Sequence, residues 1–323
     1  RSRRVDGVRC AGGWTVAQVC RDARGWRRRG LAAAAGLASV LAMAPFLVWP
    51  VLALTLPPLV WSIDGGAERA GASARGRLGA AFEAGWWFGF GYFLAGLIWI
   101  GEAFLVEAEV FGWALPFAVT LMPAGLAIFF GAAAAAAGAV WRPGVGRVLA
   151  LALAFGAAEW LRGHILSGFP WNTLGYALTA PLELMQVSGL IGIYGLTLVV
   201  MLVLPLPLVV IEDAVAGRIS PRARNLGLAA TVGVLAAMWV YGSSRLASGP
   251  VAMIEGVLVR LVQPSVPQRE KWRPEHQERI FLDHLALSGG TPDGLAGIAA
   301  VIWPEAAMPF RPLDSPAALD HIG

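Results

Sequence analysis

Residues 81–100 read AFEAGWWFGFGYFLAGLIWI, and this stretch decides the class of the fold. One acidic residue, Glu83, interrupts a run that is otherwise apolar, aromatic or glycine. An α-helix of this length rises about 30 Å, which matches the hydrocarbon thickness of a bilayer. The glycines would let a neighbouring helix approach closely. The stretch therefore predicts a membrane-spanning helix.

Further apolar stretches flank this one on both sides. They cover residues 31–63, 111–140, 148–161, 184–211 and 226–243. The chain is 57% hydrophobic and only 14% charged, whereas soluble globular proteins have roughly 25% charged residues. We therefore expect a multi-span α-helical membrane protein, with its transmembrane domain at residues 31–245.

The arginines indicate how the chain crosses the bilayer, because basic residues in short loops mark the cytoplasmic side. Nine lie in residues 1–29, three in 64–77, two in 141–147 and three in 212–225. All four segments can face the cytoplasm only if residues 31–63 cross twice, as a helical hairpin. This predicts about seven transmembrane helices, a cytoplasmic arm at 1–30 and a polar linker at 64–77. The arm is interpreted as a topology signal, not as a nucleic-acid-binding patch.

The chain changes character after residue 245. Residues 256–268 (GVLVRLVQPSVPQ) and 297–310 (GIAAVIWPEAAMPF) each contain an apolar run that ends at proline, as buried strands do. Between them, RPEHQERIFLDHLALSGG at 273–290 predicts a helix that two glycines end. A strand–helix–strand unit opens an α/β domain with parallel strands. We place this domain at residues 246–323 on the outer face, and we expect it to be truncated.

Glu305 directly follows the second apolar run. Open α/β sheets place their sites at the carboxyl ends of strands, and a carboxylate beside Trp303, Pro304 and Met308 would be partly desolvated. Burial raises a carboxyl pKa toward the range useful to a general base. The alternative is a helix N-cap or a surface acid, and the residues alone favour that alternative.

Lys271 and Trp272 follow the first apolar run in a loop. A tryptophan beside a bilayer could line an acyl-chain groove or anchor the domain at the interface, and the residues alone favour the anchor. Earlier in the chain, Glu159 and Arg162 are spaced to pair on one helix face. The run GFPWN at 168–172 predicts a turn at the outer interface.

The two cysteines, Cys10 and Cys20, lie in the arginine-rich arm, and their spacing matches no zinc or redox pattern. No Gly-rich phosphate loop, HExxH or GxSxG pattern occurs in the sequence. We therefore expect neither a metal site nor a cofactor.

Several runs together resemble one family, the bacterial apolipoprotein N-acyltransferases. Besides residues 81–100, they are EWLRG…SGFPWNTLGYAL at 159–178, GLIGIYGLT at 189–197, YGSSRL at 241–246, VRLVQPSVPQREKW at 259–272 and VIWPEAAMPF at 301–310. They stand in the family's order from about residue 31 to the end. GFPWN, QPSVPQ with KW, and WPE are specific in combination.

The resemblance implies a multi-span part in the bacterial inner membrane and an outward-facing, periplasmic nitrilase-like (αββα) domain. It also implies a two-step reaction. A cysteine takes an acyl chain from a phospholipid as a thioester, and the α-amine of the diacylglyceryl-modified N-terminal cysteine of an apolipoprotein then attacks it. By the same resemblance, Glu305 is the general base of a Glu–Lys–Cys set, and Trp272 contacts substrate near the acyl groove.

The sequence departs from the family pattern after WPE. The family's lysine and cysteine lie well downstream of WPE, beyond Gly323. Lys271 lies upstream and does not match that lysine, and Cys10 and Cys20 belong to the cytoplasmic arm. The family's final membrane span is also missing. We therefore expect the chain as written to be inactive.

Three other functions remain open at this point. A transporter would need ionisable residues along a path at mid-membrane, and the predicted spans carry almost none away from their ends. A membrane-anchored nitrilase-like amidase for soluble substrates would need only one span. A purely structural scaffold is the third alternative.

Overall fold

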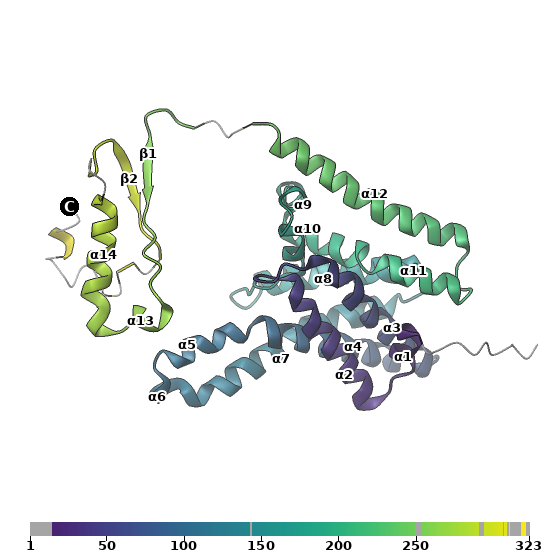
Figure 1. Cartoon of the computed structure of the whole chain (residues 1–323). Helices are drawn as coiled ribbons and strands as arrows, with labels where there is room; N and C mark the ends of the chain where they lie inside the picture. The colour runs from purple at the N-terminus through teal and green to yellow at the C-terminus, as the bar shows by residue number, and fades with distance from the viewer. Residues whose placement is uncertain are drawn as a thin grey trace, which may run out of the picture. The chain divides into compact units, whose positions relative to one another are not determined.

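The computed structural model describes residues 15–142, 144–249, 253–290, 294–305, 307–308, 310 and 318–320. The chain divides into two compact units, one made of Arg1–Ile100 with Pro116–Ser248 and the other of Gly101–Leu115 with Gly249–Gly323. The first unit is built from helices, and the second contains the two strands (Figure 1).

The helices of the first unit vary in length and are joined by short connections. They are α1 (Val16–Asp22), α2 (Gly25–Ser39), α3 (Leu52–Ala70), α4 (Ala74–Gly96), α7 (Leu115–Ala139), α8 (Val145–His164), α9 (Leu182–Met185), α10 (Ser188–Val203), α11 (Leu206–Val215) and α12 (Pro221–Leu246). Short 3-10 turns accompany them at η1 (Val40–Ala42), η2 (Trp49–Val51), η3 (Ile98–Gly101) and η5 (Leu174–Thr179).

The segment at 31–63 lies within a helical hairpin, while the double membrane crossing that the arginine pattern predicts stays a prediction. Its arms are α2 and α3, and residues 40–51 form the connection. The polar linker predicted at 64–77 is wrong, because α3 continues to Ala70 and α4 begins at Ala74. Asp64 remains helical because buried partners take up its charge. Gly71, with φ of 55°, ends the helix in a conformation that favours glycine.

Glycines let α2 and α4 pack at close range. A Cβ added to Gly36 would lie 1.8 Å from the Phe88 carbonyl oxygen, and one added to Gly91 would lie 2.0 Å from the Ala33 carbonyl oxygen. No side chain fits at such distances, so both positions require glycine. The glycines of the 81–100 stretch therefore serve helix packing, as small residues do in membrane proteins.

Aromatic rings fill the interior where α4, α7 and α8 meet. The Phe130 ring centroid lies 4.9 Å from that of Phe93, 4.8 Å from that of Phe155 and 5.9 Å from that of Tyr92. All four side chains are buried. Tyr92 and Phe93 of the 81–100 stretch thus belong to the core. The ring contacts through Phe130 fix α4 against α7 and α8.

Three helices among the described residues are long and apolar enough to cross a membrane, namely Ala108–Ala139, Ser188–Val215 and Pro221–Leu246. A fourth span arises if the pair Ala74–Gly96 and Ile98–Leu105, bent by 54°, counts as one crossing. These helices support a multi-span membrane protein. They do not confirm the expected number of about seven.

The second unit contains the predicted strand–helix–strand arrangement. Its elements are α5 (Glu102–Leu105), α6 (Ala108–Phe111), η4 (Gly112–Ala114), β1 (Leu258–Leu261), α13 (Gln268–Lys271), η6 (Pro274–His276), α14 (Gln277–Gly289) and β2 (Ile298–Ile302). Strands β1 and β2 pair in parallel, with Leu261 opposite Ile302, and α14 connects them (Figure 1). Pro274 opens the first helical turn and Gly289 ends α14, as the sequence predicts.

Candidate functional site

The parallel pairing brings two loops to one edge of the small sheet. The Val262 amide donates a hydrogen bond to the Ile302 carbonyl oxygen at 3.0 Å, which extends the pairing past the end of β1. The loop that starts at Gln263 and the loop that starts at Trp303 therefore leave the sheet side by side. This edge is where α/β sheets place their sites.

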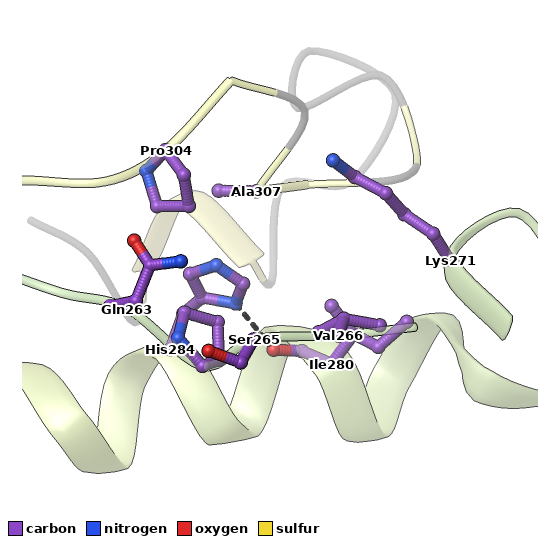
Figure 2. Close-up of a pocket in the computed structure, with 9 residues that line it drawn as sticks. Gln263, Ser265, Val266, Lys271, Ile280, His284, Pro304 and Ala307 are labelled. Carbon is purple, nitrogen blue, oxygen red and sulfur yellow. Dashed lines mark hydrogen bonds between the residues drawn. The ribbon is translucent and has the colours of Figure 1, made fainter. Parts of the chain in front are cut away.

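A cavity of about 120 Å³ lies at this edge (Figure 2). It is lined by residues from both loops, from α13 and from α14: Gln263, Pro264, Ser265, Val266, Lys271, Ile280, His284, Pro304 and Ala307. The Lys271 Nζ donates a hydrogen bond to the Glu305 carbonyl oxygen at 3.1 Å. Lys271 therefore links the loop after β1 to the loop after β2.

Glu305 stands at the predicted position, three residues after β2 ends. Its side chain is exposed among the described residues, in contrast to the partial desolvation that the strand end predicts. The difference arises because the chain turns at Pro304–Ala307, where the Ala307 amide bonds to the Pro304 carbonyl oxygen at 3.2 Å. In its exposure to solvent, Glu305 resembles the surface acid that was the alternative prediction.

Trp272 and Trp303 have different surroundings. Trp272 is 46% exposed, which suits an apolar contact outside the cavity. Trp303 packs against α14, where its Nε1 donates to Ser288 Oγ at 2.8 Å and its ring lies 6.1 Å from that of Phe281. The WPE run thus contributes a tryptophan that fixes β2 against α14.

His284 lines the cavity but belongs to none of the motifs singled out in the sequence. Its side chain is 1% exposed, and its Nδ1 lies 2.7 Å from the Ile280 carbonyl oxygen. The signal was present, because His284 is spaced four residues after Ile280 and three after Phe281, on the buried face of α14. A histidine on an otherwise apolar helix face is the feature that could have identified it.

Glu159 and Arg162 form the predicted pair near the end of α8. Arg162 Nη2 lies 3.5 Å from Glu159 Oε2, and both side chains are fully buried. Arg162 also donates through Nη1 to the carbonyl oxygens of Phe169 and, at 2.9 Å, of Trp171. The pair is therefore not only a helix contact, because the arginine holds the GFPWN loop.

The loop at 168–172 is a turn, as predicted. Asn172 has φ of 53°, and its Nδ2 donates to the Gly96 carbonyl oxygen at 3.1 Å. The Tyr92 hydroxyl donates to the Asn172 carbonyl oxygen at 2.9 Å. Trp171, 55% exposed, and Trp99 stand at the edge of a neighbouring cavity of about 280 Å³.

A buried cluster of charged side chains joins four segments of the helical unit. Arg21 contacts Asp64 at 2.9 Å and Glu212 at 2.5 Å. Arg147 contacts Asp213 at 2.8 Å and Asp64 at 3.4 Å. These segments are the arm, the end of α3, the start of α8 and the end of α11. Described residues from all four segments that the arginine pattern assigns to one side of the membrane therefore meet in this cluster.

Two further side chains complete this cluster. Arg218 Nε lies 2.8 Å from Asp213 Oδ1, and Trp141 Nε1 donates to Asp64 Oδ1 at 2.9 Å. The sequence identified these arginines only as charges in loops. Several of them are instead buried with carboxylates, because acidic residues from distant segments compensate their charge.

Cys20 has the properties of a structural thiol. Its side chain is 2% exposed in contact with α3 and α11 residues, and burial raises its pKa from 9.0 to about 11. A thiol with such a pKa remains protonated at neutral pH and is a poor nucleophile. Cys10 lies outside the described residues. No group of three or more His, Cys, Asp or Glu among the described residues could hold a metal ion.

Comparison with known proteins gives a consistent family assignment. Residues 35–205 match the model of the apolipoprotein N-acyltransferase N-terminal domain. An apolipoprotein N-acyltransferase of Rhodopseudomonas palustris is 45% identical over 290 residues, which cover 88% of this chain and 53% of that protein. The corresponding protein of Bradyrhizobium diazoefficiens is 44% identical over 290 residues, with 88% and 52% covered.

A third relative, the apolipoprotein N-acyltransferase of Agrobacterium fabrum, is 39% identical over 301 residues, covering 93% of this chain and 55% of that protein. The chain thus spans about half the length of the curated relatives it matches. The matches include both the helical unit and the unit with the two strands.

Proposed function

The chain belongs to the apolipoprotein N-acyltransferase family, and from this premise we propose that it serves N-acylation of lipoproteins in the bacterial inner membrane. The donor is a phospholipid, and the acceptor is the α-amine of the diacylglyceryl-modified N-terminal cysteine of an apolipoprotein. The observation that carries the proposal is the family match across residues 35–205. Relatives at 39–45% identity extend the match into the unit that contains Glu305.

The chemistry proposed for the protein is a double displacement. A thiolate attacks the ester carbonyl carbon of the phospholipid, forms a C–S bond and releases a lysophospholipid alkoxide that takes up a proton. The acceptor amine then attacks the thioester, so that a C–N bond forms, the C–S bond breaks and the thiol is regenerated. Glu305 is the proposed general base, and its exposure leaves the carboxylate accessible to solvent protons.

Neither cysteine in the sequence fits the nucleophile. Cys20 belongs to the helical unit and its thiol is buried, and Cys10 belongs to the same arm. We propose that the unit with β1 and β2 contributes substrate binding and the general base Glu305. Trp272 would contact an acyl chain. The 46% exposure of Trp272 leaves its ring available for that contact.

The finer topology is part of the same proposal. We place the end of the helical unit that holds Arg21, Arg147 and Arg218 in the cytoplasm, because arginine marks that side. About seven spans then leave the unit with β1 and β2 in the periplasm. That unit is proposed to be nitrilase-like, with β1, α14 and β2 as parts of an αββα arrangement; the parallel strand pair supports this.

The test uses the gene product that carries these residues, expressed from its natural start to its natural stop. In a bacterium depleted of its own N-acyltransferase, mass spectrometry of a lipoprotein's N-terminal peptide reports the third acyl chain. The proposal expects this chain to be present and to be lost with Glu305→Gln. Glu255→Gln, an exposed acid of the same unit, is the matched control. A free α-amine despite membrane insertion of the unaltered product would overturn the proposal.

A further inference from the structure

His284 forms the buried floor of the cavity at the carboxyl ends of β1 and β2. Its side chain is 1% exposed, while Gln263 and Ser265 at the cavity rim are exposed. Figure 2 shows the imidazole ring between Gln263 and Ala307, with a dashed line from one ring nitrogen to the Ile280 carbonyl oxygen. The floor of the cavity is therefore a polar group held in a fixed position.

The contact with Ile280 determines which ring nitrogen carries the proton. The distance from Nδ1 to the carbonyl oxygen is 2.7 Å, and a carbonyl oxygen can only accept a hydrogen bond. Nδ1 must therefore be protonated, and in the neutral ring Nε2 is an acceptor. Nε2 is buried and has no hydrogen-bond partner among the described residues. A buried acceptor of this kind requires a donor.

The cavity restricts what that donor can be. Its volume of about 120 Å³ admits a small polar group. The neighbouring cation is Lys271, whose Nζ is directed to the Glu305 carbonyl oxygen at 3.1 Å. A carboxylate or phosphate would suit Lys271 but offers no N–H or O–H to His284. The matching ligand is a small group with a hydrogen to donate.

The two substrates of the proposed reaction differ in whether their reacting group can donate a hydrogen bond. The reacting carbonyl of a phospholipid ester or of a thioester only accepts hydrogen bonds, whereas a primary amine donates them. We propose that His284 Nε2 accepts a hydrogen bond from the α-amine of the acceptor and so positions that amine in the cavity. This inference rests on the proposed function. A bond through N–H leaves the nitrogen lone pair free to attack.

The direct test is ¹⁵N NMR of the histidine rings, because the chain contains only four histidines. The full chain, labelled with ¹⁵N-histidine in phosphocholine micelles, is titrated with a peptide that carries an N-terminal S-diacylglyceryl-cysteine. His284→Gln identifies the His284 signals by their loss. The comparison peptide is the desamino analogue, in which a hydrogen replaces the α-amine and every other group is retained.

The proposal expects the Nε2 resonance of His284 to move with the free-amine peptide and to stay in place with the desamino peptide. Equal movement with both peptides would show that another group reaches the ring, and no movement with either would show that water alone occupies the cavity. Each of these two results overturns the inference. If the unaltered gene product still transfers acyl chains in either case, the proposed function holds and only the role proposed for His284 is wrong.

Kinetics of the gene product supply a second readout. His284→Leu removes the acceptor and should raise the KM for the acceptor peptide about tenfold, the value of one hydrogen bond, a larger change than in the rate of thioester formation from phospholipid. His284→Gln retains an oxygen acceptor and should restore part of the affinity. Partial recovery in His284→Gln also separates the lost hydrogen bond from a folding defect. An unchanged KM in His284→Leu would contradict the proposal.

Discussion

Arg21 and Asp64 are 43 residues apart in sequence, yet Arg21 Nη2 lies 2.9 Å from Asp64 Oδ2 in the interior of the helical unit. Both side chains are only 8% exposed. The contact fixes the short helix α1 to α3, and Arg147 extends it to α8 and α11. Residues 15–30 of the arm, which the sequence identifies only by its charge, thus belong to the helical unit.

Removing one partner of this cluster should be strongly destabilising. Asp64→Asn leaves the arginines of the cluster with one fewer compensating charge. Because Arg21 keeps Glu212 and Arg147 keeps Asp213, the cost should approach without reaching that of a fully uncompensated buried charge, about 3–5 kcal/mol. We expect a large fall in the thermal unfolding temperature of the detergent-solubilised protein, followed by circular dichroism.

The matched control for Asp64→Asn is Arg29→Gln, which removes an ion pair at the surface. Arg29 Nε lies 2.7 Å from Glu83 Oε1, but the Arg29 side chain is 52% exposed. Such a pair contributes about 0–1 kcal/mol, so the control should unfold near the temperature of the unaltered protein. Equal falls for both variants would mean that burial does not decide the strength of these contacts.

A second prediction compares two glycines of α2. A Cβ at Gly36 would lie 1.8 Å from the Phe88 carbonyl oxygen, whereas one at Gly30 would have no heavy atom within 4 Å. Gly36→Ala should therefore force α2 and α4 apart at a cost of about 1–3 kcal/mol. Gly30→Ala should stabilise α2 by up to about 1 kcal/mol. Thermal unfolding of the two variants, measured side by side, checks the opposite signs.

Some features of the fold follow from spacing along the chain, and others depend on contacts between distant segments. The apolar residues at 31–63 predicted helices there, because helix formation depends on spacing along the chain, whereas the double crossing that the arginine pattern predicts stays a prediction. The linker predicted at 64–77 is wrong because local charge does not exclude helix when its partners are buried with it. The burial of Asp64 depends on Arg21, Trp141 and Arg147 from other segments, and no local pattern carries that information.

The third prediction concerns the GFPWN loop. Arg162 donates through Nη1 to the carbonyl oxygens of Phe169 and Trp171 while its Nη2 faces Glu159, and the single nitrogen of a lysine cannot occupy both positions. Arg162→Lys should increase amide hydrogen exchange across residues 166–174, measured by mass spectrometry. Arg222→Lys, an exposed arginine of α12, is the control. Unchanged exchange in Arg162→Lys would show that the loop holds its conformation without the guanidinium.

The candidate site likewise has features that local sequence predicts and features that it does not. WPE and KW point to Glu305 and Trp272 because both motifs are local, and the roles of these two residues stay a prediction. The cavity itself is lined by their neighbours Pro304 and Lys271. The cavity was not predictable, since it forms only when the parallel pairing of β1 and β2 brings Gln263 and Pro304 to one edge. The exposure of Glu305 likewise follows from the turn after β2, which spacing alone does not define.

The last prediction concerns the buried thiol of Cys20. Its pKa is raised from 9.0 to about 11 by desolvation, so the folded protein favours the protonated form. A group with a raised folded pKa contributes stability that is fully present below its unfolded pKa and is lost as pH rises through its folded pKa. The relevant window is therefore pH 9.0 to about 11.

Two measurements on a Cys10→Ser background, which leaves Cys20 as the only thiol, test this. At about pH 8, iodoacetamide should modify Cys20 slowly in the folded protein and rapidly after unfolding in dodecyl sulfate, because only the thiolate reacts. Across the stated window, the unfolding temperature should fall more steeply than in a Cys10→Ser/Cys20→Ala double variant. Rapid modification of the folded protein would instead reveal an accessible thiolate at Cys20, and the exclusion of this thiol as the acyl-transfer nucleophile would then be wrong.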